Sequence, residues 1–305
     1  MRAGPLSLDA FLRQRAADRR LARLTHDLPL PEAVGLEFGP GDNPVPLPNG
    51  MQVAYVDRAI DHAIDARPDQ TGLASIDFAW DGGTSLAAVL GDAGPPGGFD
   101  FAIAAQVAQY VPNLLGWLRG IHAVLRPGGV LNLSLPDRRF MFDAARPSST
   151  LPELVEADLL RLTRPSPRQL FAHTAEVRAV SPDEIWAGAD VHRADRLAGT
   201  QALSHALDET LTALASGCYI PCHCWVFTPR SVLALLDGAT RLGLFPFVLN
   251  HVSSTEPGSF EFFVSMRRDR QEKPDALRAL QDGAFAHLRG TLDRQARNAA
   301  LIAQS

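Results

Sequence analysis

Short apolar runs alternate with amphipathic stretches through the first half of the chain. The runs fall near residues 34–38, 51–56, 99–104 and 129–135. Before the last of them, residues 112–126 place leucines at helical spacing and end ahead of Gly128. Buried strands that alternate with helices are typical of a parallel sheet covered on both faces. The pattern therefore predicts an α/β fold with a mostly parallel sheet.

This alternation stops near residue 148. The next helices are expected at 151–163, 167–178, 181–187 and 200–216, with no strand between them. We expect this insertion, about 144–217, to form a helical lid over an acceptor site. Thr228 and Pro229 then predict a helix start by capping and by proline at its first position. Two apolar runs, 244–251 and 260–267, flank a polar turn and predict a terminal β-hairpin.

Both ends of the chain predict helices outside this core. Residues 7–25 form an amphipathic stretch that begins at Ser7, and a second stretch runs from Pro274 to about 303. The expected division is an N-terminal helix at 1–30, a main domain at 31–268 and a C-terminal helix at 269–305. The terminal helices are expected to dock on the domain or to form a homodimer contact.

A glycine turn and an acidic residue provide the first candidate chemistry. The strand that ends at Phe38 leads into Gly39 and Gly41, which allow the backbone to approach a ligand closely. Asp57 ends the next strand, 20 residues after Glu37, where a carboxylate can accept hydrogen bonds from both ribose hydroxyls of a nucleotide-like cofactor. Pro44 replaces the third glycine of a dinucleotide fingerprint, which favours a smaller adenosine cofactor over NAD or FAD.

The motifs GLEFGPGDNP and VAYVDRA resemble motifs I and II of class I S-adenosylmethionine-dependent methyltransferases. Segments 75–83, 98–143 and 222–232 extend the resemblance over most of residues 31–268. These segments are similar to bacterial methyltransferase-domain proteins often associated with surface polysaccharide and glycan synthesis. The resemblance implies S-adenosylmethionine as cofactor. It also implies a Rossmann-like, mostly parallel seven-stranded sheet that ends in an antiparallel hairpin.

The resemblance also implies a set of cofactor-binding residues. In such proteins an acid in the position of Asp77 hydrogen-bonds the adenine amino group, and the residue in the position of Phe78 packs on the ring. The alternative is that Asp77 and Asp81 only cap turns around two glycines. The complete expected set is Glu37, Gly39, Pro40, Gly41, Asp57, Asp77, Phe78, Ala105 and Gln106.

The sequence departs from its relatives beside the expected methyl group. Many relatives carry a Ser-His pair and a later Glu-His pair, where this chain has Ala105-Gln106 and Gln109-Tyr110. A histidine base in this position is therefore absent. The departure leaves open a degenerate protein that binds cofactor or glycan, or acts as a scaffold, without catalysis.

Three other residues are candidates for catalysis. His223 lies beside Trp225 in a stretch that matches the relatives, and Asp137 follows the fifth strand, so either side chain can serve as a base for a hydroxyl acceptor. Arg139 is expected to clamp a hydroxyl-rich or carboxylate-bearing acceptor. The alternatives are a packed core histidine and a solvated salt-bridge turn.

Composition narrows the class of protein further. A formal net charge of −5 argues against a general nucleic-acid binder, and no apolar run reaches the roughly 20 residues that span a bilayer. The N-terminus lacks the apolar region of a secretory signal. Cys218, Cys222 and Cys224 lack the paired spacing of zinc sites, so we expect no metal and a cytoplasmic protein.

These observations lead to a ranked set of functions. We expect methyl transfer from S-adenosylmethionine to an oxygen or nitrogen of a small-molecule or glycan acceptor, in polysaccharide or natural-product biosynthesis. The degenerate binding or scaffolding protein is the alternative. A nicotinamide-dependent reductase ranks third, because Pro44 and the terminal hairpin disfavour it.

Overall fold

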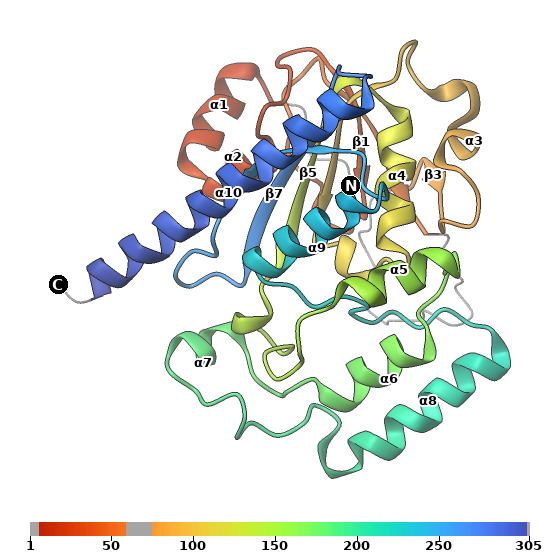
Figure 1. The fold of residues 1–305 in the computed structure, drawn as a ribbon, viewed down its shortest axis with the longest axis vertical. Coiled ribbons are helices and arrows are strands. Elements are labelled where there is room, and N and C mark those ends of the chain that lie inside the picture. Colours follow the sequence, from red (N-terminus) through yellow and green to blue (C-terminus); the bar gives the residue numbers. More distant parts are fainter. Residues whose placement is uncertain (1–5, 59–74, 304–305) are drawn as a thin grey trace.

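A single seven-stranded sheet organises the computed structural model, which describes residues 6–58 and 75–303 (Figure 1). Its strand order is β3-β2-β1-β4-β5-β7-β6. All neighbours are parallel except β7, which is antiparallel to both β5 and β6. The predicted sheet and hairpin are confirmed. The strands are β1 (Val34–Phe38), β2 (Gln52–Asp57), β3 (Phe78–Ala79), β4 (Phe99–Ala105), β5 (Leu125–Pro136), β6 (Val248–Val252) and β7 (Glu261–Arg267).

Alternate residues of the central strands pack into two separate cores. In β4, Phe101 and Ile103 face one side, while Ala102 and Ala104 face the other. The first side is covered by α1 (Leu8–Ala17) and α2 (Arg19–Leu24), and the second by a larger helical layer. Both faces of the parallel strands are therefore buried, as their near-continuous apolar sequences require. The larger layer includes α3 (Leu86–Leu90), α4 (Leu114–Val124), α9 (Pro229–Arg241) and α10 (Pro274–Ala303).

The N-terminal region differs from the single helix predicted over residues 7–25. Asp18 ends α1 and begins α2, because its side-chain Oδ1 accepts a 3.0 Å hydrogen bond from the Leu21 amide. An aspartate in this position satisfies an amide that the helix end leaves unpaired. The break also directs the arginines of α2 toward the region around the start of β7.

The insertion after β5 forms the lower part of the molecule in Figure 1. Its first helix also belongs to the main core, because Leu154 and Ala157 are buried there. The insertion begins and ends side by side: the Arg138 amide donates to the Phe227 carbonyl at 2.8 Å, and the Ser149 amide donates to Val226 at 2.9 Å. Its helices are α5 (Leu151–Leu159), α6 (Pro167–Glu176), α7 (Pro182–Trp186) and α8 (Ala202–Ser216).

Helix α10 docks on the domain, in agreement with one of the two roles predicted for it. Phe285, Leu288 and Leu292 are buried in the main core, and the Gln281 amide donates to the Phe247 carbonyl at 3.0 Å. Its C-terminal end projects past the remaining elements in Figure 1. Within residues 6–58 and 75–303, none of the helices has both the length and the apolar character needed to cross a bilayer.

Candidate active site

The glycine turn after β1 combines two left-handed residues with different surroundings. Gly39 and Gly41 both have φ of 57°, a conformation that favours glycine. A Cβ atom at Gly39 would lie 2.6 Å from Val107 Cγ2, whereas a Cβ at Gly41 would meet nothing within 4 Å. Gly39 is therefore needed for packing, and Gly41 borders open space that a ligand can occupy.

Glu37 lies directly before this turn with an unsatisfied oxygen. The residue is 3% exposed, and its Oε1 accepts a 2.9 Å hydrogen bond from the Val45 amide. Oε2 is buried and has no partner in the described part of the chain. Burial raises the pKa of Glu37 to about 7, although the Val45 hydrogen bond and the charge of Arg20 oppose the shift. The site thus presents an acceptor atom that suits a ligand with N–H or O–H donors.

Asp57 is the last residue of β2, and it lies at the carboxyl end of the parallel strands, as the glycine turn after β1 does. Its neighbour Val56 pairs with Phe38, so Asp57 stands beside the glycine turn. Oδ1 accepts a 2.7 Å hydrogen bond from the Arg58 amide. Burial raises the pKa of Asp57 above its ordinary value, against the hydrogen bond and charge of Arg58. The geometry brings Glu37, the glycine turn and Asp57 together, as the sequence spacing predicts.

Asp77, the residue expected to contact adenine, lies next to the short strand β3. Because β3 is only Phe78–Ala79, Asp77 precedes the strand rather than following it. Its Oδ2 accepts a 2.8 Å hydrogen bond from the Tyr55 amide, within the sheet. Asp81 is the acid beyond the carboxyl end of β3, where its Oδ1 accepts from Gly83 at 2.8 Å. Asp77 is thus engaged by the backbone of β2, whereas Asp81 lies just beyond the carboxyl end of β3.

Arg58 and Tyr219, which the sequence did not single out, lie over the carboxyl end of β2 beside Asp57. The Arg58 guanidinium carbon lies 3.7 Å from the centroid of the Tyr219 ring. Arg58 also donates to the Thr163 carbonyl at 2.9 Å, and the Tyr219 hydroxyl donates to the Tyr110 carbonyl at 3.1 Å. The insertion thus closes over the ends of β2 and β4. The sequence feature that could have pointed to Arg58 is its position directly after Asp57.

Ala105 and Gln106 end β4 in a constrained geometry. Gln106 has φ of 60°, which is uncommon for a residue other than glycine and occurs often at functional sites. Its backbone amide donates to the carbonyl and the hydroxyl of Ser134, both at 3.1 Å. Its side-chain amide donates to Glu261 Oε2 at 3.1 Å. These contacts fix the amide beside the expected methyl position.

The polar contacts continue from Gln106 toward His223. The Gln109 side-chain amide donates to the Gln106 carbonyl at 2.9 Å. The Gln109 carbonyl accepts from the Cys224 amide at 2.8 Å. Gln109 Oε1 is buried without a partner in the described chain. The ends of β4, β5 and β7 are therefore joined to the segment that carries His223.

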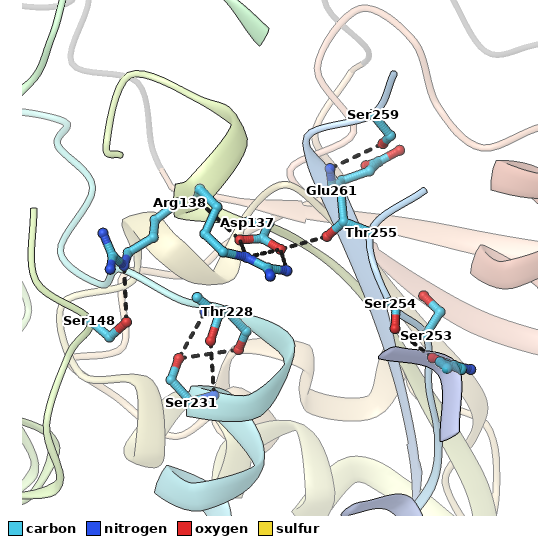
Figure 2. Close-up of polar contacts among 12 residues, drawn as sticks. Asp137, Arg138, Ser148, Thr228, Ser231, Ser253, Ser254, Thr255, Ser259 and Glu261 are labelled. Carbon is cyan, nitrogen blue, oxygen red and sulfur yellow. Dashed lines mark hydrogen bonds and ion pairs between the residues drawn. The ribbon is translucent and has the colours of Figure 1, made fainter. Parts of the chain in front are cut away.

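Asp137 and Arg139 are brought together, but Asp137 is not open to an acceptor. Asp137 is fully buried; its carboxylate accepts from Arg139 Nε at 2.9 Å and from the Thr255 hydroxyl at 2.7 Å (Figure 2). Both carboxylate oxygens therefore already have partners. In this arrangement Asp137 orients Arg139, whose side chain is half exposed.

His223 belongs to a buried polar cluster. Its Nδ1 lies 2.5 Å from Asp143 Oδ2, and Arg146 donates to Asp143 Oδ1 at 2.7 Å. Burial favours the neutral acid, but the hydrogen bond to His223 and the charges of His223 and Arg146 hold the pKa of Asp143 below its ordinary value. His173 lies nearby, and burial followed by the charges of Arg146 and His223 lowers its pKa to about 4. His223 is therefore held by an ionised carboxylate.

The aromatic rings of Tyr110 and Phe142 enclose His223. Tyr110 packs edge-on against the imidazole with centroids 4.7 Å apart, and Phe142 lies 4.9 Å away. Trp225, two residues after His223, is fully buried in the main core and donates to the Val111 carbonyl. The Cys222 and Cys224 sulfur atoms lie 3.9 Å apart without a disulfide. Among the residues described, no three His, Cys, Asp or Glu side chains form a metal-binding group.

The strand order, the antiparallel β7 and the glycine turn at the carboxyl end of β1 define a Rossmann-like domain of methyltransferase topology. The chain belongs to the methyltransferase domain family, whose sequence model matches residues 11–239. S-adenosylmethionine is accordingly its cofactor, as predicted. The residues fit this molecule, because Glu37 Oε2 lacks a partner and Gly41 borders open space.

Solved structures with similarity to the chain have low sequence identity. A Mesorhizobium loti S-adenosylmethionine-dependent methyltransferase is 17% identical, with a TM-score of 0.38, over 82% of this chain and 96% of the other. A 1,6-didemethyltoxoflavin-N1-methyltransferase from Burkholderia thailandensis, solved with S-adenosylhomocysteine, is 13% identical, with a TM-score of 0.38, over 86% and 80%. A protein from Rhodobacter sphaeroides described as a zinc-dependent alcohol dehydrogenase is 14% identical, with a TM-score of 0.44, over 82% and 90%. No curated protein sequence matches the chain.

Proposed function

We propose that this chain transfers a methyl group to an oxygen or nitrogen of a small-molecule or glycan acceptor, with His223 as the base. The observation that carries the proposal is the buried 2.5 Å contact between His223 Nδ1 and Asp143 Oδ2. When bound, S-adenosylmethionine supplies an electrophilic methyl group. The residues of the chain must then align the acceptor, exclude water and receive its proton.

The contact with Asp143 defines which nitrogen of His223 can act. An ionised Asp143 accepts a hydrogen bond, so Nδ1 carries the proton and Nε2 keeps its lone pair. No hydrogen bond joins Nε2 to any residue in the described part of the chain. Nε2 is therefore the atom that takes the acceptor's proton, and the Asp143 carboxylate stabilises the imidazolium that results.

Arg146 holds Asp143 in place, so that Asp143 can act as a positioning residue for His223. It bonds Asp143 Oδ1 and also donates to the His223 carbonyl at 3.1 and 3.2 Å. The histidine is thus held through both its ring and its backbone. The rings of Tyr110 and Phe142 exclude water from the imidazole, which strengthens the contact with Asp143.

Arg139 supplies the expected contact with hydroxyl or carboxylate groups of the acceptor. Asp137 orients its guanidinium through Nε and Nη2, which leaves the Nη1 face for a ligand. The cofactor-binding set proposed for this reaction is Glu37, Gly39, Pro40, Gly41, Asp57, Phe78, Ala105 and Gln106, with Asp81 in place of Asp77.

Incubation with labelled S-adenosylmethionine and fractionated cell glycans and metabolites tests the activity. Transfer of label to a component of one fraction is expected, and it identifies the pathway as polysaccharide or natural-product biosynthesis. With that acceptor, His223→Gln should reduce turnover by roughly 100- to 10,000-fold, the usual contribution of a general base. His205→Gln, on exposed α8, is the matched control. Unchanged turnover in His223→Gln would remove the base assignment and favour the binding-protein alternative.

Two features of the chain support further parts of the proposal. The projecting end of α10 is where we place a homodimer contact, which light scattering on the full chain and on a chain ending at residue 295 can test. The three cysteines are unpaired, which supports a reducing cytoplasmic location. Fractionation of cells that produce the protein tests this location.

A further inference from the structure

A cleft of about 380 Å³ lies between α2 and the region around the start of β7. Arginines from one short helix form one wall, and the opposite wall contains Ser259, Glu261 and Phe263. Figure 2 shows Ser259 and Glu261 next to each other, where the Glu261 amide donates to the Ser259 hydroxyl at 3.2 Å. The volume is at the lower end of the range of small-molecule pockets, roughly 300–1,000 Å³. The cleft is therefore large enough for a small metabolite.

Ion pairs across the cleft leave unused donors rather than unused acceptors. Arg20 Nε donates to Glu261 Oε1 at 2.8 Å, and Arg23 Nη2 donates to Glu256 Oε1 at 2.6 Å. Arg19 Nη1 donates to the second oxygen of Glu256 at 3.3 Å. Each guanidinium has five N–H donors, and each uses one nitrogen in these pairs. A ligand that binds in the cleft must therefore supply hydrogen-bond acceptor atoms.

The two carboxylates are already engaged. Glu261 Oε2 accepts from Gln106, so both of its oxygens have partners. Burial favours the neutral form of Glu256, but hydrogen bonds and charges of Arg23 and Arg19 hold its pKa below the ordinary value. Three guanidiniums thus face two paired carboxylates, and the remaining acidic residue, Asp18, caps α2. The groups of the cleft that remain available to a ligand are therefore positively charged N–H donors.

The cleft is also connected to the reaction centre. Gln106, at the end of β4, bonds Glu261 in the wall of the cleft at 3.1 Å. The charge of Arg20 acts on Glu37, which lies before the glycine turn. A molecule bound by α2 would therefore adjoin both the cofactor turn and the end of β4. This is the place for an acceptor rather than for a remote effector.

We infer that this cleft binds the acceptor through a carboxylate or phosphate group, which the unused N–H donors of Arg20 and Arg23 hold. The inference rests on the proposed function, because it assigns the anion to the methyl acceptor. Guanidiniums bind planar carboxylates and phosphates through paired hydrogen bonds, which neutral hydroxyls match less well. Phe263, under Arg23 at 5.7 Å from its guanidinium carbon, gives the ligand an apolar floor.

The test uses the full chain saturated with S-adenosylhomocysteine. D-galacturonate, D-galactose and inorganic phosphate are titrated by calorimetry at constant ionic strength, since salt screens exposed charges. We expect galacturonate or phosphate to bind at least about fivefold more tightly than galactose, and Arg23→Gln to weaken that binding roughly 10- to 100-fold. Arg13→Gln, an exposed arginine on α1, should leave it unchanged. Equal binding of all three probes, or no binding, overturns the inference.

Two further measurements separate the alternatives. S-adenosylhomocysteine should bind wild type, Arg23→Gln and Arg20→Lys with the same affinity, which also shows that the variants are folded. If Arg20→Lys weakens S-adenosylhomocysteine tenfold but leaves 5′-methylthioadenosine unaffected, the cleft holds the cofactor carboxylate and the inference fails. If wild type binds the anions but not S-adenosylhomocysteine, the proposed function fails while the cleft remains an anion site.

Discussion

The guanidinium of Arg58 lies over the ring of Tyr219, with 3.7 Å between its central carbon and the ring centroid. Arg58 follows the ribose-binding candidate Asp57, and Tyr219 belongs to the chain that returns from the helical insertion. The contact therefore joins cofactor binding to the placement of the insertion. Neither residue alone would reveal this connection, because 161 positions separate them in the sequence.

Tyr219→Leu is expected to weaken S-adenosylhomocysteine binding. The change removes a cation–π contact of roughly 0.5–2 kcal/mol, equivalent to about 2- to 30-fold in affinity. Tyr219→Phe keeps the ring and loses only the hydrogen bond to Tyr110, so its affinity should stay close to wild type. Calorimetry on both variants is the measurement. A Leu variant that binds as well as the Phe variant would contradict the connection.

Asp57→Ala should reduce S-adenosylhomocysteine affinity by roughly 5- to 150-fold, since about 1–3 kcal/mol of hydrogen bonding to the ribose is lost. Asp92→Ala is a matched control, because Asp92 is an exposed acid outside the site. Calorimetry on the two variants gives the comparison. Equal affinities would mean that Asp57 does not contact the cofactor.

Glu37 should give the apo protein a characteristic pH dependence. Its folded pKa of about 7 exceeds the ordinary value of 4.5, so the folded state keeps this proton to higher pH than the unfolded chain. Stability therefore falls as pH rises from about 4.5 to about 7 and then levels off, by up to about 3 kcal/mol. Glu37→Gln should remove this component.

Urea unfolding of wild type and Glu37→Gln at pH 5 and pH 8 measures the difference. The variant should gain stability relative to wild type at pH 8 and lose affinity for S-adenosylhomocysteine. A stability difference that is the same at both pH values would show that Glu37 ionises normally.

The two glycines of the turn should respond differently to alanine. Gly39→Ala adds the left-handed cost of roughly 1–2 kcal/mol and a clash with Val107, which together destabilise the fold. Gly41→Ala adds only the conformational cost, but its Cβ enters the open space beside the turn. Thermal unfolding should rank Gly39→Ala as the less stable. Gly41→Ala should show its larger effect in cofactor affinity, and the opposite ranking would contradict this assignment.

Asp143→Asn should destabilise the protein by roughly 3–5 kcal/mol, because it leaves Arg146 buried without its counter-ion. The depressed pKa of Asp143 also has a pH consequence. The stability from its ionised form is present above the unfolded pKa and is lost as pH falls through the lower folded pKa. Asp282→Asn, in an exposed pair with Arg278, is the control and should change stability by less than about 1 kcal/mol.

The elements with continuous apolar patterns could be predicted closely. The strands near 34–38 and 99–104 have nearly the observed bounds, because both faces are buried and most positions are apolar or small. The helix that starts at Pro229 was also predictable, since Thr228 and Ser231 form a capping box there. Patterns among neighbouring residues were sufficient to predict these strands and this helix.

The remaining features depend on contacts between distant residues. A two-residue strand such as β3 has no periodicity, so the sequence could not place Asp77 before it rather than after it. Asp143 is 80 positions from His223, and no local signal connects them. The break at Asp18 was different, because aspartate is a preferred residue at the N-cap of a helix.

The neighbouring ends of the helical insertion have a consequence for how such a chain can diversify. Arg138 and Phe227 are hydrogen-bonded, so the sheet fixes the span that the insertion must close, whatever its length. Doubling the length of a flexible loop adds only about 0.6 kcal/mol of closure entropy. Helices beyond α5 can therefore be lengthened, shortened or exchanged with little strain on the sheet. A library that replaces residues 180–216 could then vary the insertion while the Arg58 contact with Thr163 at the cofactor site stays intact.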